Sequence, residues 1–360
     1  MMDTVGSSVY RPVNLDRDYL AGIAFDRYSK KYGKISRNLS AHQRDRLLED
    51  FRQHIRYLQE ALAIDSPAIF IDYIRWMQVL LDREHLPGDY LASSLLALDE
   101  VLRKELPPDY RESTSSFLKA GIEALKIPPV EIPSFITDDN PHSAIAKSYL
   151  DALIAADRES ARAVIVGATR SGVPVRDLYL NVFQPVLREI GRLWQVGKVS
   201  VAQEHYMTAT TGNIIAWLHD QVISSRGSVK RKRKTLVAAC VAEELHEIGV
   251  RMVADFFDMD GWDTYYIGAN TPAQSLLQAV GDLHADVLAI SSTMLFHTPV
   301  VHYIIRSLRA DPRTAKVRII VGGYPFTLVP DLWRQIGADA VAGSADEAVA
   351  IANRLMAVVP

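Results

Sequence analysis

Residues 235–249 read TLVAACVAEELHEIG, which is an apolar run, a short charged loop and a glycine. An apolar run of about four to eight residues between polar segments is typical of a strand buried on both faces of a sheet. Four more strand candidates follow, separated by amphipathic helical stretches, at 263–266, 287–291, 318–321 and 340–341. Strands that alternate with helices in this way predict an α/β domain over residues 235–360, with a five-stranded parallel sheet and helices on both faces.

The chain before this domain reads as two helical regions joined by a linker. Over residues 1–126, apolar side chains recur at spacings of three and four, and Ser40 and Ser66-Pro67 are of the types that start helices. These signals predict an N-terminal helical bundle of four or more helices. Residues 127–141 hold four prolines and little periodicity, so we expect an extended linker there.

A second helical set follows the linker. Asn140-Pro141 has the composition of a helix start, and Gly172 and Gly197 stand where helix ends favour a residue that tolerates positive φ. The apolar periodicity predicts helices at about 142–156, 158–171, 174–195 and 200–223. We therefore expect a four-helix cap over residues 142–228, directly before the sheet domain.

Composition limits the class of protein. The chain has 360 residues, 48% of them hydrophobic, and a net charge of −3, which gives no global attraction to nucleic acid or to an anionic membrane. No apolar run approaches the roughly 18 residues of a membrane span, and the N-terminus lacks the pattern of a signal peptide. We therefore expect a cytoplasmic protein without membrane contact.

Two local features have plain structural explanations. Cys240 is the single cysteine, which excludes an internal disulfide and a cysteine-built metal site, and its place in an apolar run predicts a buried, unreactive thiol. The basic run Lys230–Lys234 joins the cap to the sheet domain. It has no aromatic neighbours and no helix-turn-helix pattern before it, so a solvated linker is favoured over a nucleic-acid patch.

His246 is the strongest candidate for chemistry, because it stands in the loop after the first strand. Ligands of open α/β sheets bind beyond the carboxyl ends of the strands, and imidazole is a good ligand for cobalt. Glu244 can accept a hydrogen bond from the other ring nitrogen, and Gly249 lets a bulky ligand pass close to the helix start. A single loop histidine is by itself compatible with an ordinary surface residue.

Two further loops end at the same edge of the predicted sheet. Ser292 follows the third strand in AISSTMLFH, and Gly322-Gly323 follows the fourth in IIVGGYPF. The carboxyl ends of parallel strands share one edge, so we expect all three loops to converge on one site. A Gly-Gly pair alone would indicate only a tight turn.

The three loops together resemble the cobalamin-binding domain of methionine synthase, corrinoid methyl carriers and base-off mutases. The pattern of that family is Asp-x-His-x-x-Gly, then Ser-x-Leu, then Gly-Gly. The chain matches it at His246, Gly249, Ser292, Gly322 and Gly323, and departs from it at Glu244 for Asp and at Met294 for Leu. The segments IGANTP (267–272) and GADAVAGSADEAV (337–349) are also similar to this family.

The resemblance implies a flavodoxin-like fold for the sheet domain and a cobalamin as cofactor. It implies that His246 replaces the cofactor's own base as the lower axial ligand of cobalt, next to Leu245 and Glu244. It further implies that the nucleotide tail occupies a slot near Ser292, Met294 and Gly322-Gly323.

The cap carries a second motif, in which Trp194 is followed after nine residues by Glu204-His205. The third cap helix is expected to end near Trp194 and Ser200 to cap the fourth, so both parts lie at one helix junction. This motif resembles that of adenosylcobalamin photoreceptors, the light-responsive repressors with a MerR-type DNA-binding head. The resemblance implies that Trp194 covers the upper axial group, that Glu204 holds the adenosine and that His205 lies nearby.

Two departures from those repressors bear on mechanism. Gln195 stands where they have the histidine that binds cobalt after photolysis, and no MerR-type head is present, so direct DNA binding is not expected. Residues 1–126 instead resemble, in helical layout and aromatic content, the N-terminal region of photocobilins, which pair cobalamin with biliverdin. The aromatic residues behind this likeness are Tyr57, Phe70, Tyr73 and Trp76. The candidates for polar contacts, each of which also suits an ordinary surface or capping role, are His54, His85, His297 and His302.

Three functions stay open from the sequence. The first is a light sensor that binds adenosylcobalamin, with biliverdin as an optional second chromophore, and signals through a light-dependent homo-oligomer or contact with a downstream protein. The alternative is a corrinoid methyl-carrier protein for a methyltransferase, and the third is a haem-based redox sensor. An enzyme is not expected, because the sequence shows no barrel repeat, nucleophile–base pair or phosphate loop.

Overall fold

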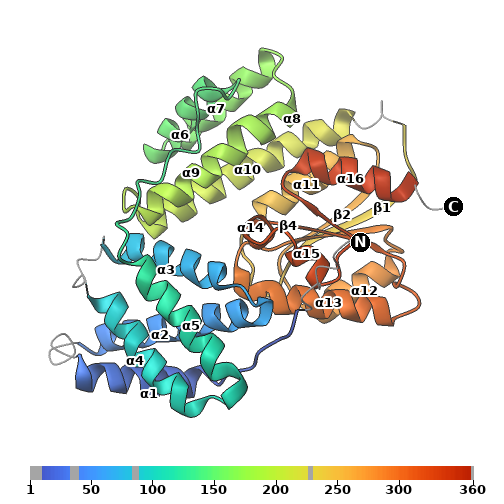
Figure 1. Cartoon of the computed structure of the whole chain (residues 1–360). Helices are drawn as coiled ribbons and strands as arrows, with labels where there is room; N and C mark the ends of the chain where they lie inside the picture. The colour runs from blue at the N-terminus through green and yellow to red at the C-terminus, as the bar shows by residue number, and fades with distance from the viewer. Residues whose placement is uncertain (1–9, 33–39, 83–88, 226–229, 358–360) are drawn as a thin grey trace, which may run out of the picture. The chain divides into compact units, whose positions relative to one another are not determined.

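The computed structural model of the chain describes residues 10–32, 40–82, 89–225 and 230–357. The chain divides into two compact units, Met1–Glu131 and Ile132–Pro360 (Figure 1). The first unit is helical, and the second holds a helical cap and a parallel sheet. The predicted fold class, a helical region followed by a parallel α/β domain, is confirmed.

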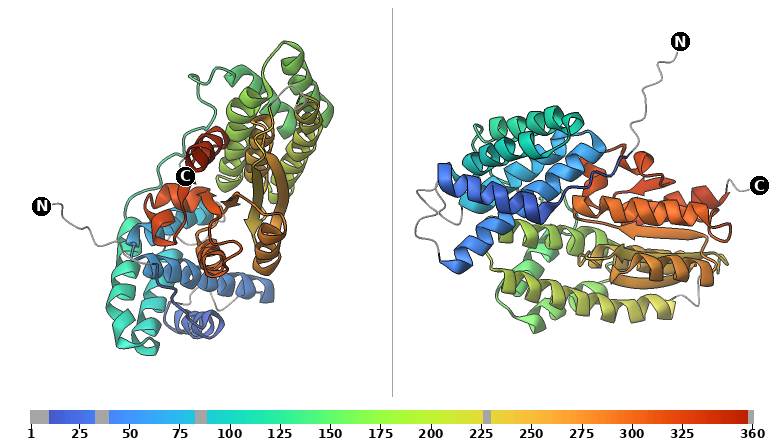
Figure 2. Two further views of the ribbon diagram at one scale, coloured as in Figure 1. Left: turned by 90° about the vertical axis from the view of Figure 1, so that its right-hand side faces the viewer. Right: turned by 90° about the horizontal axis from the view of Figure 1, so that it is seen from below.

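The first unit is a helical bundle (Figure 2). Its described helices are α1 (Arg17–Lys31), α2 (Ala41–Ile64), α3 (Pro67–Asp82), α4 (Tyr90–Glu105) and α5 (Pro108–Ala124). Ser40 caps α2 as predicted, because its hydroxyl accepts the N–H of Gln43 while the Gln43 side chain accepts the N–H of Ser40. The candidate His85 lies outside the described residues.

Aromatic rings fill the core of the first unit. Tyr57 and Tyr73 stack with ring centroids 4.0 Å apart, and Tyr73 also lies edge-on to His54. His54, for which a surface or capping role was expected, is fully buried: its Nδ1 lies 2.7 Å from the Tyr73 hydroxyl and its Nε2 lies 3.3 Å from the Ser94 hydroxyl. Burial lowers the pKa of His54 to about 3, so the ring is a neutral part of the core.

Glu60 gives the first unit a pH-dependent stability. It is buried and accepts a hydrogen bond from the Tyr10 hydroxyl at 3.2 Å, and burial raises its pKa from 4.5 to about 8. The Glu60 carboxyl ionises more readily in the unfolded chain than in the folded one. Its contribution to the free energy of unfolding is therefore fully present below pH 4.5 and is lost as the pH rises to about 8. The loss is up to about 1.4 kcal/mol of unfolding free energy per pH unit.

We therefore expect the thermal unfolding midpoint of the full chain to fall across this pH window, and Glu60→Gln to flatten that fall. The matched control is Glu112→Gln, which changes an exposed carboxylate on α5. If the wild type and Glu60→Gln show the same pH dependence, the assignment to Glu60 is wrong.

The second unit begins within the predicted linker. Ile136 is buried, the N–H of Phe135 donates to Glu189 at 2.9 Å, and the Asn140 side chain donates to the carbonyl oxygen of Asn181 at 2.7 Å. The later half of the linker is therefore fixed on the cap. The helix predicted from about residue 142 forms as α6, which begins at Ser143, but its cap residue is His142 rather than Asn140, whose Oδ1 accepts the N–H of His142.

The cap follows the predicted helical pattern with one interruption. Its helices are α6 (Ser143–Ile154), α7 (Arg158–Arg170), α8 (Val175–Leu178), α9 (Gln184–Gln195) and α10 (Val201–Ser225). A π-helical turn, Tyr179–Phe183, interrupts the predicted helix 174–195 and places the rings of Tyr179 and Phe183 in the core. Gly172 and Gly197 end helices with φ of 87° and 75°, as the sequence predicts.

The sheet has strand order β2-β1-β3-β4-β5 with parallel neighbours, which is the flavodoxin-like order. The strands are β1 (Thr235–Val241), β2 (Asp263–Thr271), β3 (Val287–Ser291), β4 (Arg318–Gly322) and β5 (Ala340–Ala342). β2 continues past the predicted end at Tyr266, because Gly268 and Thr271 of the IGANTP segment pair with β1 after register shifts.

Helices cover both faces of the sheet (Figure 1). α11 (Ile248–Met259) and α16 (Ala345–Ala357) pack together on one face, α12 (Ala273–Asp282) and α13 (Thr298–Ala310) lie on the other, and the short α14 (Tyr324–Leu328) and α15 (Leu332–Gln335) follow β4. The cap and the sheet share one hydrophobic core, which includes Phe183 from the cap and Phe256 from α11. This shared core fixes the cap beside the sheet.

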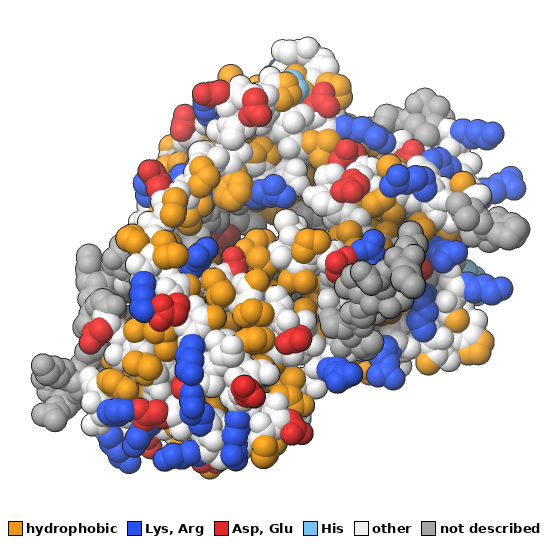
Figure 3. All heavy atoms as spheres, in the orientation of Figure 1, with side chains coloured by type: hydrophobic (Ala, Val, Ile, Leu, Met, Phe, Trp, Pro, Cys, Tyr) orange, Lys and Arg blue, Asp and Glu red, His pale blue; other side chains and the backbone are white. Residues whose placement is uncertain are grey.

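The surface and the cysteine agree with the sequence analysis. Acidic and basic side chains are interspersed over the face drawn in Figure 3. Lys230–Lys234 is largely exposed, with ion pairs such as Lys232–Asp260 at 2.6 Å. Cys240 is buried, and burial raises the pKa of its thiol to about 12. None of the described helices combines the length and apolarity that crossing a membrane requires.

Candidate functional site

The loop after β1 carries His246, and the end of β2 holds this loop in place. Glu243 has a φ of 65°, and its N–H donates to Asn270 Oδ1 at 2.9 Å. The N–H of Asn270 donates to the carbonyl oxygen of Glu244 at 2.9 Å. Both hydrogen bonds depend on β2 running on to Thr271, so the longer strand is part of what positions the site.

Glu244 joins the loop after β1 to the loop after β3. It is fully buried. Its Oε1 accepts from the ring Nδ1 of His246 at 2.5 Å and from the N–H of His246 at 3.0 Å, and its Oε2 accepts the N–H groups of Thr293 and Met294 at 2.6 and 3.3 Å. Burial raises the pKa of Glu244, but the hydrogen bonds from His246, His297 and the backbone lower it by more. The side chain is therefore a carboxylate.

His246 presents its second ring nitrogen outward. Its Nδ1 is engaged by Glu244, and its side chain is 61% exposed, so Nε2 is the ring atom left to bind a ligand. The hydrogen bond to Glu244 raises the pKa of His246, and the charge of Glu204 on α10 adds to that rise. Leu245 beside it is 71% exposed, so an apolar side chain and an imidazole stand together at the sheet edge.

Ser292 and the two glycines pack backbone against backbone. The N–H of Ser292 donates to the carbonyl oxygen of Gly322 at 3.0 Å, and the Ser292 hydroxyl donates to that of Met294 at 3.2 Å. Gly323 has a φ of 110°, and a Cβ there would lie 1.9 Å from the carbonyl oxygen of Ser292. Gly323 is therefore required for the close approach of the loops after β3 and β4, and a Cβ on Gly322 would lie 3.0 Å from the carbonyl oxygen of Ala342 in β5.

Gly249 has a different environment. It lies in the first turn of α11, and no described atom outside that helix's own nearby backbone would come within 4 Å of an added Cβ. Internal packing therefore gives no reason for a glycine at this position. The open space directly follows the loop that carries His246.

The cap junction between α9 and α10 is formed as predicted. Ser200 caps α10 reciprocally with Gln203, through hydrogen bonds of 3.2 and 2.8 Å. Gly197, with its positive φ, ends the preceding turn, and its N–H donates to the carbonyl oxygen of Trp194 at 3.0 Å. Trp194 is half-buried and packs against the core of the cap.

Glu204 and His205 form a contact pair at this junction. Glu204 Oε2 lies 2.5 Å from His205 Nδ1, and its Oε1 accepts the Thr208 hydroxyl at 2.9 Å. His205 is exposed. Because the charge of Glu204 acts on His246, the junction and the β1 loop lie within electrostatic reach of each other.

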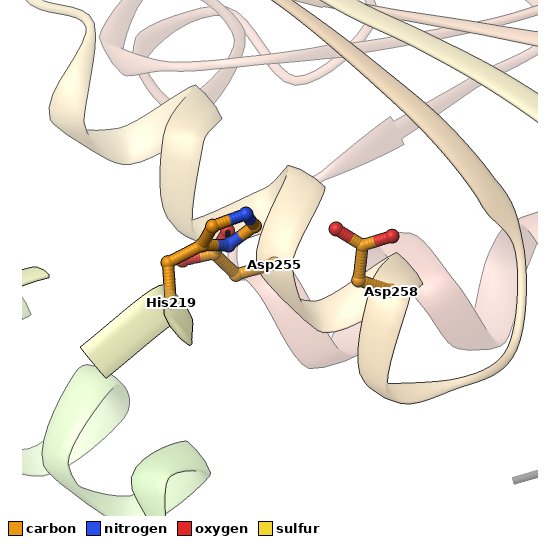
Figure 4. A group of neighbouring side chains, drawn as sticks. All are labelled: His219, Asp255 and Asp258. Carbon is orange, nitrogen blue, oxygen red and sulfur yellow. Dashed lines mark hydrogen bonds and ion pairs between the residues drawn. The ribbon is translucent and has the colours of Figure 1, made fainter. Parts of the chain in front are cut away.

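A second cluster ties the cap to α11. Figure 4 shows His219 from α10 with Asp255 and Asp258 from α11, whose donor atoms lie within 4.8 Å of one another. Asp255 Oδ1 lies 2.7 Å from His219 Nδ1, and Asp255 Oδ2 accepts the Tyr179 hydroxyl at 2.7 Å. Since both Asp255 oxygens contact cap residues, Asp255 fixes α11 to the cap.

The sequence analysis missed two of these contacts. Asp255 with His219 and Tyr179 gives no local signal, because the three residues come from separate elements. His297 was considered only as a surface or capping residue with a candidate polar contact, but it is buried and its Nδ1 lies 3.1 Å from Glu244. Its place in the loop after β3, at the same edge as His246, is the signal that could have identified it. His302, by contrast, is partly buried and lies 3.2 Å from the carbonyl oxygen of Ile336.

Comparison with known proteins agrees with this architecture. Residues 145–219 and 234–352 each match a family model described as B12 binding domain, and together these segments cover more than half of the chain. The dimethylamine corrinoid protein 3 of Methanosarcina mazei is 27% identical over 172 residues, which is 48% of this chain and 100% of that protein. The dimethylamine corrinoid protein of Methanosarcina barkeri is 28% identical over 218 residues, which is 59% of this chain and 98% of that protein.

A solved structure shows the same fold. The monomethylamine corrinoid protein of Methanosarcina barkeri superposes with a TM-score of 0.52 at 20% sequence identity, over 60% of this chain and 100% of that protein. The two matched segments are the helical cap and the sheet domain, and the relatives are named corrinoid proteins rather than enzymes. Through these two domains the chain belongs to the family of cobalamin-binding proteins.

Proposed function

We propose that this chain is a corrinoid carrier, which binds a cobalamin through His246 and holds a methyl group on cobalt for a partner methyltransferase. The sequence analysis put a light sensor first and this function second. Two of the relatives compared above are named dimethylamine corrinoid proteins, and these names favour the carrier. The observation that carries the proposal is His246 itself, held by Glu244 and exposed at the carboxyl edge of the sheet.

The residues present fit a cobalamin. A neutral imidazole with its Nδ1 bound to a carboxylate is a suitable axial ligand, because the second-shell hydrogen bond fixes the tautomer and raises ligand basicity. The open space at Gly249 leaves room for a bulky group beside that ligand. The exposed Leu245 offers an apolar contact to the lower side of a flat ring.

Each part of the chain has a distinct task in this proposal. Glu244 orients His246, and the packed loops at Ser292 and Gly322-Gly323 hold the sheet edge to which the nucleotide tail binds. Trp194 and Glu204 at the junction of α9 and α10 would shield a bound cobalamin from water. Bound cobalamin would supply a cobalt–carbon bond, from which the methyl group can pass to an acceptor held by the partner methyltransferase, and the protein would set access to it.

The light sensor is the second candidate, and the cap junction is the observation that favours it. Trp194 with the Glu204-His205 pair lies at the junction of α9 and α10, within electrostatic reach of His246. In this case the upper ligand is adenosylcobalamin, and light alters the packing of Trp194 and thereby a homo-oligomer or a contact with a downstream protein. Gln195 follows Trp194, so His205 is the candidate to bind cobalt after photolysis.

One experiment separates the two functions. The full chain is loaded in the dark with methylcobalamin or adenosylcobalamin, and its elution volume is compared before and after green light. A carrier keeps its elution volume in all four samples. A sensor changes it with adenosylcobalamin, and Trp194→Ala and Glu204→Gln abolish that change while His246 still gives its axial-ligand spectrum.

Biliverdin belongs to the sensor proposal alone. The residues behind it, Tyr57, Phe70 and Tyr73, form a packed aromatic core with His54, so a bilin would bind there only if that core opened. Expression of the full chain with biliverdin should then give a red absorption band that is lost in Tyr73→Leu. A chain purified without such a band would remove the second chromophore.

A further inference from the structure

The Glu244 carboxylate is shared by two imidazole rings from two different loops. Its Oε1 lies 2.5 Å from His246 Nδ1, and its Oε2 lies 3.1 Å from His297 Nδ1. Three backbone N–H groups, those of His246, Thr293 and Met294, also donate to these two oxygens, which is the pattern of a carboxylate that only accepts, so both ring nitrogens donate. His297 therefore acts on the same group that orients the candidate axial ligand.

The burial of the His297 side chain costs free energy. It is 2% exposed, and within the described part of the chain its Nε2 has no hydrogen-bond partner. With Nδ1 as the donor, a neutral ring leaves Nε2 as a buried acceptor, which costs about 1–3 kcal/mol. A leucine of similar volume would avoid this cost, so packing alone does not explain a histidine at this position. The hydrogen bond to Glu244 explains the histidine.

We propose that His297 is a positioning residue for the cobalt site, which draws charge from Glu244 and so weakens the bond between His246 and cobalt. This inference rests on the proposed role of His246. A carboxylate that accepts more hydrogen bonds on one oxygen is a weaker acceptor on the other. His246 then donates less strongly to Glu244, keeps less imidazolate character and binds the metal less tightly.

A weaker lower ligand has a chemical consequence for a carrier. In the loaded protein, an external one-electron donor would reduce cobalt from the +2 to the +1 state, and the His246 ring would be released because the +1 ion is stable without it. A tightly bound imidazole opposes this reduction, and a loosely bound one permits it. His297 thus sets how easily the bound cobalamin reaches the state that accepts a methyl group.

Two substitutions of His297 test separately the hydrogen-bond donor of its ring and the volume of its side chain. In His297→Asn, the side-chain amide N–H can take the place of the ring Nδ1–H, and the buried acceptor Nε2 is removed. In His297→Leu, the volume stays and the donor is lost. The full chain and both variants are loaded with hydroxocobalamin, and the midpoint of the Co(II)/Co(I) couple is measured by spectroelectrochemistry, with the nitrogen splitting in the Co(II) electron paramagnetic resonance spectrum as a second readout.

We expect His297→Leu to disfavour the Co(I) state about tenfold, a shift of about 59 mV to more negative potential for one electron. Its nitrogen splitting should increase, while His297→Asn stays close to the wild type in both readouts. A role in packing alone would move the thermal unfolding midpoint of the apoprotein and leave the potential unchanged.

Two results overturn the inference and leave the proposed function standing. One is an unchanged potential in His297→Leu, with His246→Ala still losing its nitrogen splitting. The other is an equal shift in His297→Asn and His297→Leu, since the donor would then be irrelevant. If His246→Ala keeps its nitrogen splitting, the axial assignment itself fails and the inference fails with it.

Discussion

Replacement of His246 by alanine should remove the axial nitrogen from cobalt and weaken cobalamin binding by more than the 10- to 100-fold typical for loss of a second-shell partner. The reason is the geometry of the β1 loop, in which Glu244 holds one ring nitrogen at 2.5 Å and leaves the other exposed. The measurements are a binding titration with hydroxocobalamin and the nitrogen splitting in the Co(II) electron paramagnetic resonance spectrum.

Two variants complete this test. Glu244→Gln keeps an acceptor but loses the charge, and its amide N–H₂ would face the backbone N–H groups of Thr293 and Met294, so we expect a loss of about 10- to 100-fold in affinity. His284→Asn is the control, because His284 is exposed with a φ of 50°, which asparagine tolerates. Unchanged binding and an unchanged spectrum in His246→Ala would disprove the axial assignment.

Gly323→Ala is expected to have the largest effect on the fold of the sheet domain. At a φ of 110° an alanine is strained by about 1–3 kcal/mol. Its Cβ would also lie 1.9 Å from the carbonyl oxygen of Ser292, and the repacking that this forces costs about 1–3 kcal/mol more. The variant should therefore unfold at markedly lower denaturant concentration and bind cobalamin poorly.

Gly249→Ala is the matched control, since it changes another glycine of the same predicted motif. An added Cβ at Gly249 meets open space, so the free energy of unfolding should stay the same or rise by up to about 1 kcal/mol. Cobalamin binding should nevertheless weaken, because the methyl group enters the space proposed for the cofactor. If both variants unfold like the wild type, Gly323 does not hold the loops as described.

Much of the architecture could be predicted because its signals are local. Ser40 and Ser200 cap their helices through backbone groups three residues away. Gly172 and Gly197 adopt the positive φ that the ends of helices favour. The apolar runs at β1, β3 and β4 followed from the rule that strands buried on both faces are apolar throughout.

The errors in the fold have a common physical cause, which is competition from partners distant in sequence. Asn140 was expected to start a helix, but its side chain binds Asn181 and the N–H of His142. The π-helical turn at Tyr179–Phe183 follows no period in the sequence, because it serves the packing of two buried rings. His54 was considered for a surface or capping role, but it is buried, because the hydroxyls of Tyr73 and Ser94 form hydrogen bonds with its two ring nitrogens.

For the candidate site, the sequence by itself determined which residues lie at the carboxyl edge of the sheet, because strands that alternate with helices are parallel and place the His246, Ser292 and Gly322-Gly323 loops there. Only the tertiary structure decided that Glu244 is shared with His297, that Gly323 touches Ser292 and that Asp255 ties the cap to α11. Residue types and spacing along the chain encode the ends of strands. A hydrogen bond between two loops depends on how those ends pack in space, which no local pattern records.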